Sequence, residues 1–288
     1  MQAAPGRPTT ALVFAGGGSF GAIQVGMLKA LAAHGLQADM VLGSSVGAIN
    51  AAHYAADPTP AGIAKLESLW RAARRKDVFP LTLSSVVRFA LRRDHLVDPA
   101  SLRRLVADNL PIRRVEDTPV PLRIIATDVL TGEACVIGEG DAVEAILAST
   151  AVPVAFPTVD IGTRHLVDAA LSSNTPVRIA VSLGATRIVV LPTGFSCALA
   201  RPPRDAIAKA LHSLTLLIAS QLVREIESLD ASIDFTIVPP LCPLEGSPYD
   251  FSNSADLIDR SYRMTEAWIG SGGLERRVIP GALRAHHH

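Results

Sequence analysis

One serine of the sequence lies in a pattern that supports nucleophilic chemistry. Residues 43–47 read GSSVG, which has the form G-x-S-x-G, between a strand-like apolar run and a helix-like segment. In such a nucleophile elbow the serine lies on a strained turn, and small neighbours, here Gly43 and Gly47, let the chain bend sharply. The dipole of the following helix favours negative charge on the serine oxygen. We therefore predict that Ser45 is the nucleophile of an acyl transfer.

A glycine-rich loop precedes this elbow in the chain. Residues 16–21 read GGGSFG and lie between a predicted strand and a predicted helix. Successive backbone N–H groups near the start of a helix bind developing negative charge. We expect the N–H groups of Gly16, Gly17 and Gly18, together with that of Val46, to form an oxyanion hole.

The same loop also matches G-x-G-x-x-G, which is the dinucleotide-binding pattern. That pattern requires an acid about 20 residues further on, at the carboxyl end of the second strand, to bind a ribose. Asp39 has roughly this offset, but it precedes the predicted strand and therefore lies at the wrong end of it. A dinucleotide-binding enzyme is thus the weaker interpretation, and nucleotide-dependent thermal stabilisation would revive it.

A serine nucleophile needs a base that takes its proton, and histidine is the usual one. His53 lies on the elbow helix, two turns beyond the serine. His212 lies inside an apolar helical stretch, where a packed or surface histidine is expected, and His95 belongs to a basic segment. None of these three histidines has a convincing position for the role.

Asp168 is a better candidate for the base. It ends a predicted strand and is followed by Ala169 and Ala170, which are small residues that suit a crowded turn. His165 lies three residues earlier on the same strand, so the two side chains face opposite sides. A carboxylate can itself take a serine proton when burial raises its pKa toward the working range. We predict that Asp168 is the base for Ser45.

The elements that position these residues follow from the hydrophobic pattern. Buried strands alternate with helices, which indicates an α/β fold of three layers, with helices on both faces of a mostly parallel sheet. Such sheets place their chemistry directly after strands, where both glycine-containing motifs lie. The predicted strands cover residues 11–15, 40–43, 122–127, 134–137, 158–161, 165–168, 187–191 and 235–238, and the predicted helices cover 22–33, 46–56, 141–149, 204–229 and 254–269.

A basic helical segment interrupts this alternation. Residues 65–114 contain twelve Lys and Arg against five Asp and Glu. We predict one domain over residues 1–284, with this segment as a cap at about 62–118, and we interpret 285–288 as a tag remnant. The cap could contact an anionic membrane surface, or it could be a solvated helix face with its own small core. The apolar side chains expected to enter the lipid interface are Phe79, Leu81, Leu83, Val86, Val87, Phe89 and Leu91.

Composition narrows the class of protein further. The 288 residues carry a formal net charge of zero, which gives no reason to expect nucleic acid as a partner. The three cysteines are scattered, which argues against a disulfide framework and a zinc site. There is no signal-peptide pattern and no apolar run of about 18 residues, so we expect a cytoplasmic protein, with membrane association as an option.

Taken together, the motifs resemble those of the patatin-like phospholipase family. That family has a glycine-rich oxyanion loop, a G-x-S-x-G elbow and an Asp-Gly-Gly/Ala motif, to which Asp168-Ala169-Ala170 is similar. The block at residues 146–157, the stretch ATDVLTGE from Ala126 and the run Asn174-Thr175-Pro176 also resemble the family, in the right order, between about residues 10 and 195. The resemblance implies a patatin-like fold and a Ser45–Asp168 dyad that cleaves acyl esters of phospholipids or related lipids through an acyl-enzyme, with no metal or cofactor.

The chain departs from the family pattern at two positions. Phe20 stands where the family often has Arg or Lys in the loop, so a charge that orients a phosphate is missing. Ala169 replaces the middle glycine of the dyad motif, and a positive φ there would cost an alanine about 1 kcal/mol. The alternative is therefore a catalytically silent binding or regulatory module of the same fold.

Overall fold

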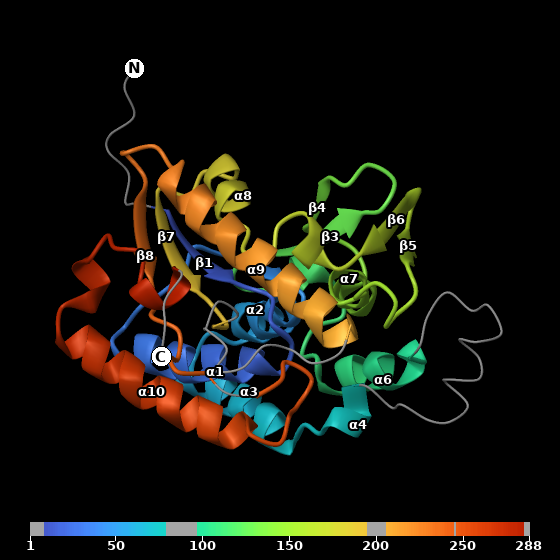
Figure 1. The fold of residues 1–288 in the computed structure, drawn as a ribbon, viewed down its shortest axis with the longest axis horizontal. Helices are drawn as coiled ribbons and strands as arrows, with labels where there is room; N and C mark the ends of the chain where they lie inside the picture. Colours follow the sequence, from blue (N-terminus) through green and yellow to red (C-terminus); the bar gives the residue numbers. More distant parts are fainter. Residues whose placement is uncertain (1–8, 79–96, 195–205, 245, 285–288) are drawn as a thin grey trace.

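The computed structural model describes residues 9–78, 97–194, 206–244 and 246–284, and these form a sheet of eight strands between helices (Figure 1). The strands are β1 (Thr10–Phe14), β2 (Met40–Ser44), β3 (Leu122–Asp128), β4 (Ala134–Ile137), β5 (Val159–Ile161), β6 (Arg164–Val167), β7 (Arg187–Leu191) and β8 (Asp234–Ile237). Their order is β5-β6-β3-β2-β1-β7-β8, and β4 pairs with β3.

The centre of the sheet is parallel. β3, β2, β1, β7 and β8 run in one direction, whereas β4 and β6 are antiparallel to β3, and β5 is antiparallel to β6. In the register of β1 and β2, Phe14 lies opposite Gly43. The loop after β1 and the elbow after β2 therefore emerge side by side at the same edge of the sheet.

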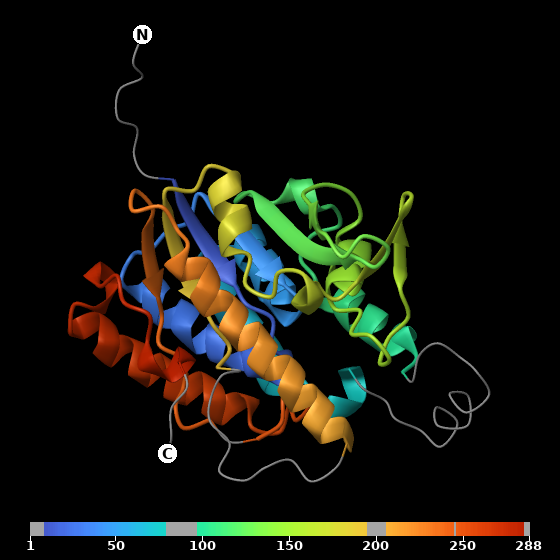
Figure 2. The same ribbon diagram turned by 45° about the horizontal axis from the view of Figure 1, so that its top comes forward.

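Helices cover both faces of the sheet (Figures 1 and 2). They are α1 (Gly21–Ala33), α2 (Val46–Ala56), α3 (Pro60–Ala72), α4 (Arg75–Val78), α6 (Pro99–Asn109), α7 (Ala142–Ser149), α8 (Val177–Ser182), α9 (Ala206–Glu227) and α10 (Ser254–Gly270). Short 3-10 turns occur at η1 (Gly18–Phe20), η2 (Val115–Asp117), η3 (Ala169–Leu171), η4 (Gly273–Glu275) and η5 (Gly281–Leu283).

The central strand β1 explains why both faces need a cover. Leu12 and Phe14 belong to the larger core, which includes buried side chains of α1, α2, α3, α7 and α10. Ala11 and Val13 belong to a second core, which lies under α8 and α9. β1 is buried along its whole length and is apolar after Thr10, as is typical of a parallel strand that is covered on both faces. The predicted three-layer, mostly parallel α/β fold is confirmed, and the ends of the predicted strands and helices differ from the observed ones by at most two residues.

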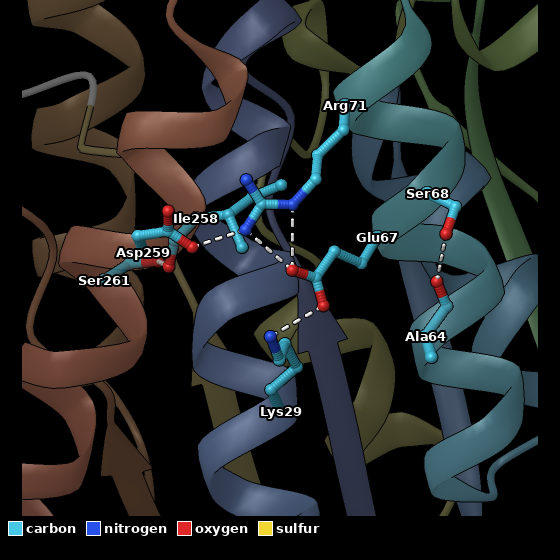
Figure 3. Close-up of polar contacts among 8 residues, drawn as sticks. All are labelled: Lys29, Ala64, Glu67, Ser68, Arg71, Ile258, Asp259 and Ser261. Atoms are coloured by element: carbon cyan, nitrogen blue, oxygen red, sulfur yellow. Dashed lines mark hydrogen bonds and ion pairs between the residues drawn. The ribbon is translucent and has the colours of Figure 1, made fainter.

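An ion cluster joins three helices on one face (Figure 3). Glu67 of α3 accepts from Arg71 one turn later, at 2.8 and 2.9 Å, and lies 2.6 Å from the Lys29 ammonium of α1. The same Arg71 guanidinium pairs with Asp259 of α10. Lys29 also lies over the ring of Tyr262, 5.2 Å from its centroid. The cluster therefore fixes α3, which begins the predicted cap segment, to α1 and α10.

The predicted cap is only partly visible in the structure. Residues 79–96, which include all the side chains expected to enter a membrane, lie outside the described residues. Its described parts, α3, α4 and α6, contribute side chains to a cavity beside the elbow. The extent of the cap as a unit stays a prediction. None of the described helices is long and apolar enough to cross a membrane.

Candidate active site

Ser45 occupies a strained turn between β2 and α2. Its backbone has φ 53° and ψ −127°, a conformation that costs a non-glycine residue about 1–3 kcal/mol. The flanking glycines make this turn possible. A Cβ at Gly43 would lie 2.4 Å from the Gly47 carbonyl oxygen, and one at Gly47 would lie 2.5 Å from the Phe14 carbonyl oxygen. The elbow predicted from G-x-S-x-G is thus present, and both glycines are needed for close backbone packing.

Asp168 contacts the elbow serine directly. The Ser45 hydroxyl donates to Asp168 Oδ2 at 2.7 Å, although the two residues are 123 positions apart. The backbone N–H of Ala170 donates to Oδ1 at 2.8 Å. The aspartate is only 2% exposed. Burial raises the pKa of Asp168 to about 6, against the smaller lowering effect of these two hydrogen bonds.

Ala169 does not strain the dyad motif. It begins the 3-10 turn η3, with Asp168 as the residue that caps it. Among the described residues, the non-glycine positions with positive φ are Ser45 and Val154. The replaced glycine therefore carries no backbone penalty here, and the geometric reason for expecting a silent site is removed.

Several ordinary polar residues hold the dyad in position, and sequence reasoning gave none of them a role. Ser149 Oγ accepts from the Ser45 backbone N–H at 2.8 Å. Thr127 Oγ1 donates to the Asp168 carbonyl at 2.8 Å, and Ser44 Oγ donates to the Ser173 carbonyl at 2.8 Å. Ser149 and Thr127 lie in the two blocks that resemble the family, and this resemblance was the one feature of the sequence that could have drawn attention to them.

The glycine loop lies beside the serine, and its N–H groups differ in whether they already have an acceptor. The N–H of Gly16 donates to the Asn174 carbonyl at 3.0 Å, so Gly16 cannot serve as an oxyanion donor in this arrangement. Within the described residues, Gly17 and Gly18 make no backbone N–H hydrogen bond, and both line the cavity with Ser45. Val46 also lines it and is the first residue of α2, where N–H groups have no partner in the helix.

A segment near the C-terminus supports this loop from the outside. The N–H of Ser19 donates to the Pro248 carbonyl at 2.7 Å, and Ser19 Oγ donates to the Ser247 carbonyl at 3.1 Å. A Cβ at Gly18 would lie 2.3 Å from the same Pro248 oxygen. The glycine loop is therefore held in contact with residues 247–248.

A buried chain of amides links the loop to the cap side. Gln24 Nε2 donates to the carbonyls of Ala15 and Leu191, both at 2.8 Å, next to the carboxyl ends of β1 and β7. Asn50 donates to Gln24 Oε1 at 2.8 Å and accepts from the Trp70 indole N–H at 2.8 Å. These hydrogen bonds fix α1, α2 and α3 relative to the strand ends. Phe20, where the family often has a cation, is instead buried in the larger core.

Within the described residues, no histidine forms a hydrogen bond with Ser45 or Asp168, and other histidines fall outside the description. His165 is exposed and pairs with Asp160 at 2.7 Å. His53 lines the cavity, and burial lowers its pKa to about 4. His95 and the side chain of His212 lie outside the described residues. Asp39 accepts from the Thr10 N–H at 2.8 Å, at the amino end of β1, so it cannot bind a ribose at the loop.

A largely apolar cavity of about 190 Å³ opens from the dyad. Asp168 and Ser45 lie in its wall with Gly17 and Gly18, and α2, α3 and α6 extend it away from the sheet. Its apolar lining includes Ile49, Leu69, Trp70, Val106, Phe156 and Ile218. This arrangement can support acyl transfer: a serine hydroxyl bonded to a buried carboxylate lies at the end of an apolar cavity, beside backbone N–H groups that have no partner within the described residues.

Several known proteins are similar to this chain over part of their length. The chain is 27% identical to patatin-like phospholipase domain-containing protein 7 of Rattus norvegicus over 189 residues, which are 64% of this chain but 13% of that protein. It is 26% identical to an uncharacterized NTE family protein of Mycobacterium bovis over 199 residues, 69% of this chain and 52% of that one. VipD from Legionella pneumophila matches 91% of this chain and 67% of its own with a TM-score of 0.45 and 14% identity.

The family model described as patatin-like phospholipase matches residues 12–181, which is more than half of the chain. The match begins in β1 and ends in α8, so it contains the glycine loop, the elbow and the aspartate motif. The chain belongs to the patatin-like phospholipase family.

Proposed function

We propose that this protein is a serine acyl hydrolase that cleaves fatty-acyl esters of phospholipids or related lipids. Its family is one of lipid acyl hydrolases. The observation that carries the proposal is the 2.7 Å hydrogen bond from the Ser45 hydroxyl to Asp168. The carboxylate that accepts it is buried and has a pKa of about 6, so it is ionised at neutral pH yet basic enough to take a proton.

In the first step, Asp168 Oδ2 takes the proton of Ser45 as its oxygen attacks the ester carbonyl carbon. The negative charge that forms on the carbonyl oxygen is held by the N–H groups of Gly17, Gly18 and Val46. Removal of one such donor typically slows a reaction by about 100- to 1000-fold. When the tetrahedral intermediate collapses, protonated Asp168 gives its proton to the departing alcohol, and an acyl-enzyme on Ser45 remains.

In the second step, a water molecule replaces the alcohol. Asp168 takes a proton from this water while the oxygen attacks the acyl carbon, and the same N–H groups hold the new oxyanion. Collapse releases the fatty acid, and the proton on Asp168 returns to Ser45. Every proton transfer uses the one carboxylate, and no metal or cofactor takes part.

The cavity supports a fatty-acyl chain as the bound group. Apolar side chains from α2, α3 and α6 extend from the dyad, and burial of each methylene contributes about 0.8 kcal/mol. Phe20 places no charge in the loop that could select a phosphate. Neutral glycerides are therefore substrates to test beside phospholipids and lysophospholipids.

Active-site labelling tests the proposal. A fluorophosphonate should form one adduct on the wild type, detectable by intact mass, and none on Ser45→Ala. Ester hydrolysis should fall by about 10⁴-fold or more in Ser45→Ala, because the nucleophile of the dyad is lost. Turnover within a few-fold of the wild type in a folded Ser45→Ala protein would refute the assignment. An unlabelled, well-folded wild type would instead favour a silent binding module.

Peripheral contact of the cap segment with an anionic membrane is a separate proposal. It rests on the excess of Lys and Arg in residues 65–114. Co-sedimentation with liposomes tests it: binding should be stronger with anionic lipid and weaken at high salt. Equal binding to neutral and anionic vesicles would remove the electrostatic attraction.

A further inference from the structure

Helix α2 presents a row of side chains to the cavity. Val46, Ile49 and His53 all line it, and their spacing of three and then four residues places them on one face of the helix. Asn50 lies on another face, where it bonds to Gln24 and Trp70. The row therefore begins next to the nucleophile and ends at His53.

His53 is an unusual residue for this wall. Among the described residues its ring has no hydrogen-bond partner, whereas His34 pairs with Glu266 and His165 with Asp160. The nearby lining from α2, α3 and α6 is mostly apolar. His53 is half-buried in the cavity wall, so a ring that has no hydrogen-bond partner there is available to a ligand.

The protonation state of His53 limits what that ligand can be. Burial lowers the pKa of His53 to about 4, so the ring is neutral at pH 7. A neutral imidazole has one N–H donor and one nitrogen acceptor. It matches a hydroxyl group, which can both donate and accept. Because it is uncharged, it would not attract an acyl chain that carries a carboxylate at its far end.

Its position along α2 sets where the hydroxyl must be. His53 comes eight residues after Ser45, which is about 12 Å along a helix, or roughly nine methylene groups of an extended chain. We propose that His53 is a specificity-determining residue that binds the hydroxyl of an acyl chain hydroxylated about 8–12 carbons from the carbonyl. The proposal rests on the acyl hydrolase function above and names its substrate class as esters of hydroxylated fatty acids.

The kinetic test compares 4-nitrophenyl esters of 10-hydroxydecanoic and decanoic acid. The wild type should have a kcat/KM ratio about tenfold in favour of the hydroxylated chain, the size of effect expected when a ligand satisfies an otherwise unpaired polar group. In His53→Leu the ratio should fall about tenfold, largely because the plain chain gains. His53→Gln, which keeps a donor and an acceptor, should restore part of the preference.

The matched control is His34→Leu, which removes a surface histidine on the far end of α1 from the cavity. Its ratio should equal that of the wild type. A His53→Leu ratio within twofold of the wild-type ratio would overturn the proposal, since the ring would then make no distinction between the two chains.

A binding measurement separates this proposal from the proposed function. In the Ser45→Ala protein, calorimetry should show that methyl 10-hydroxydecanoate binds about tenfold tighter than methyl decanoate, and that adding His53→Leu removes the difference. If 4-nitrophenyl butyrate shows no Ser45-dependent hydrolysis, the proposed function fails, and this binding comparison still decides the role of His53. Equal binding of both methyl esters with His53 present would refute the proposal.

Discussion

Two carboxylates with little exposure to solvent have opposite surroundings in this protein. Glu67 lies among cations: burial raises its pKa, but hydrogen bonds from Lys29 and Arg71 outweigh that effect and hold the pKa below its usual value (Figure 3). Asp168 has only a hydroxyl and a backbone N–H as donors, and within the described residues no cation pairs with it. Its pKa is raised to about 6.

The difference shows how one type of side chain serves two purposes. A carboxylate that joins helices is stabilised as an anion, because its cationic partners offset the loss of water. A carboxylate that acts as a base must keep some affinity for a proton, and the absence of a cation preserves it. The sequence shows Arg71 four residues after Glu67, but it does not show that Lys29 of α1 is the second partner.

The largest expected contrast between the two acids is in the rate of ester hydrolysis. Asp168→Asn should lower kcat by about 10³- to 10⁴-fold, because the amide cannot take the proton of Ser45. Glu67→Gln should keep kcat within about threefold of the wild type, because Glu67 contacts neither the dyad nor the oxyanion loop. Steady-state kinetics on a 4-nitrophenyl ester would measure both. A comparable loss of kcat in the two variants would contradict the division of roles.

The pH profile should report the base. Since Asp168 must be ionised to act, kcat/KM should be level above pH 6 and fall about tenfold per pH unit below it, to about 1% of the plateau near pH 4. A profile of kcat/KM between pH 4 and 8 in buffers of constant ionic strength measures this. Glu67→Gln should keep the same midpoint. A midpoint near pH 4 in the wild type would mean that the pKa of Asp168 is not raised.

The two acids should also have opposite effects on folding stability. The pKa of folded Asp168 lies above its unfolded value, so stability falls as the pH rises from about 4 to about 6 and the destabilisation is complete at pH 7, where Asp168→Asn should raise the unfolding free energy by about 1–3 kcal/mol. The pKa of folded Glu67 lies below its unfolded value, so its stabilising effect is present at neutral pH and is lost in acid. Glu67→Gln should lower the unfolding free energy by about 1–2 kcal/mol at pH 7.

Urea unfolding at pH 7 and pH 4 measures both signs. The gain from Asp168→Asn should shrink as the pH falls from about 6 to about 4, and it should vanish below the unfolded pKa of about 4, where both folded and unfolded states hold the proton. The loss from Glu67→Gln should shrink only as the pH falls through the lowered pKa of Glu67. Effects of the same sign for both variants at pH 7 would show that the partners do not determine the stability of these acids.

The smallest expected effect comes from Ser149, which bonds to the backbone of Ser45 and not to the Asp168 carboxylate. Ser149→Ala leaves the backbone N–H of Ser45 without its acceptor, which should cost about 1 kcal/mol of stability and lower kcat by about three- to tenfold. Ser182→Ala, which removes an exposed serine bonded within α8, is the control and should change neither quantity. A loss as large as that of Asp168→Asn would make Ser149 part of the chemistry itself.

Much of the fold and the dyad was predictable because each carries a local signal. The elbow around Ser45 and the glycine loop each follow an apolar strand, and parallel strands end at one edge of the sheet, so their meeting followed from topology. Asp168 was predictable from its place at a strand end followed by two alanines. Its contact with Ser45 then required only that β6, which ends just before Asp168, pair with β3, the neighbour of β2. The structure shows both pairings.

The remaining parts had no such signal. The Gly16 N–H was predicted as an oxyanion donor, but whether it is free depends on the Asn174 carbonyl, a backbone atom at a long sequence separation. The chain from Gln24 through Asn50 to Trp70 uses side chains that are usual in any helix. Such contacts follow from three-dimensional packing, and spacing along the chain does not encode them.

The hydrogen bond from Ser19 to Pro248 shows that the region matched by the family model depends on residues outside it. The family match ends at residue 181, yet the loop that would hold the oxyanion rests on a carbonyl nearly seventy residues beyond that end. The matched region thus contains Ser45 and Asp168 but not residues 247–248, which contact the glycine loop. A transplant of residues 12–181 into another host would carry the dyad but leave the loop unsupported, so the grafted unit must include a substitute for residues 247–248.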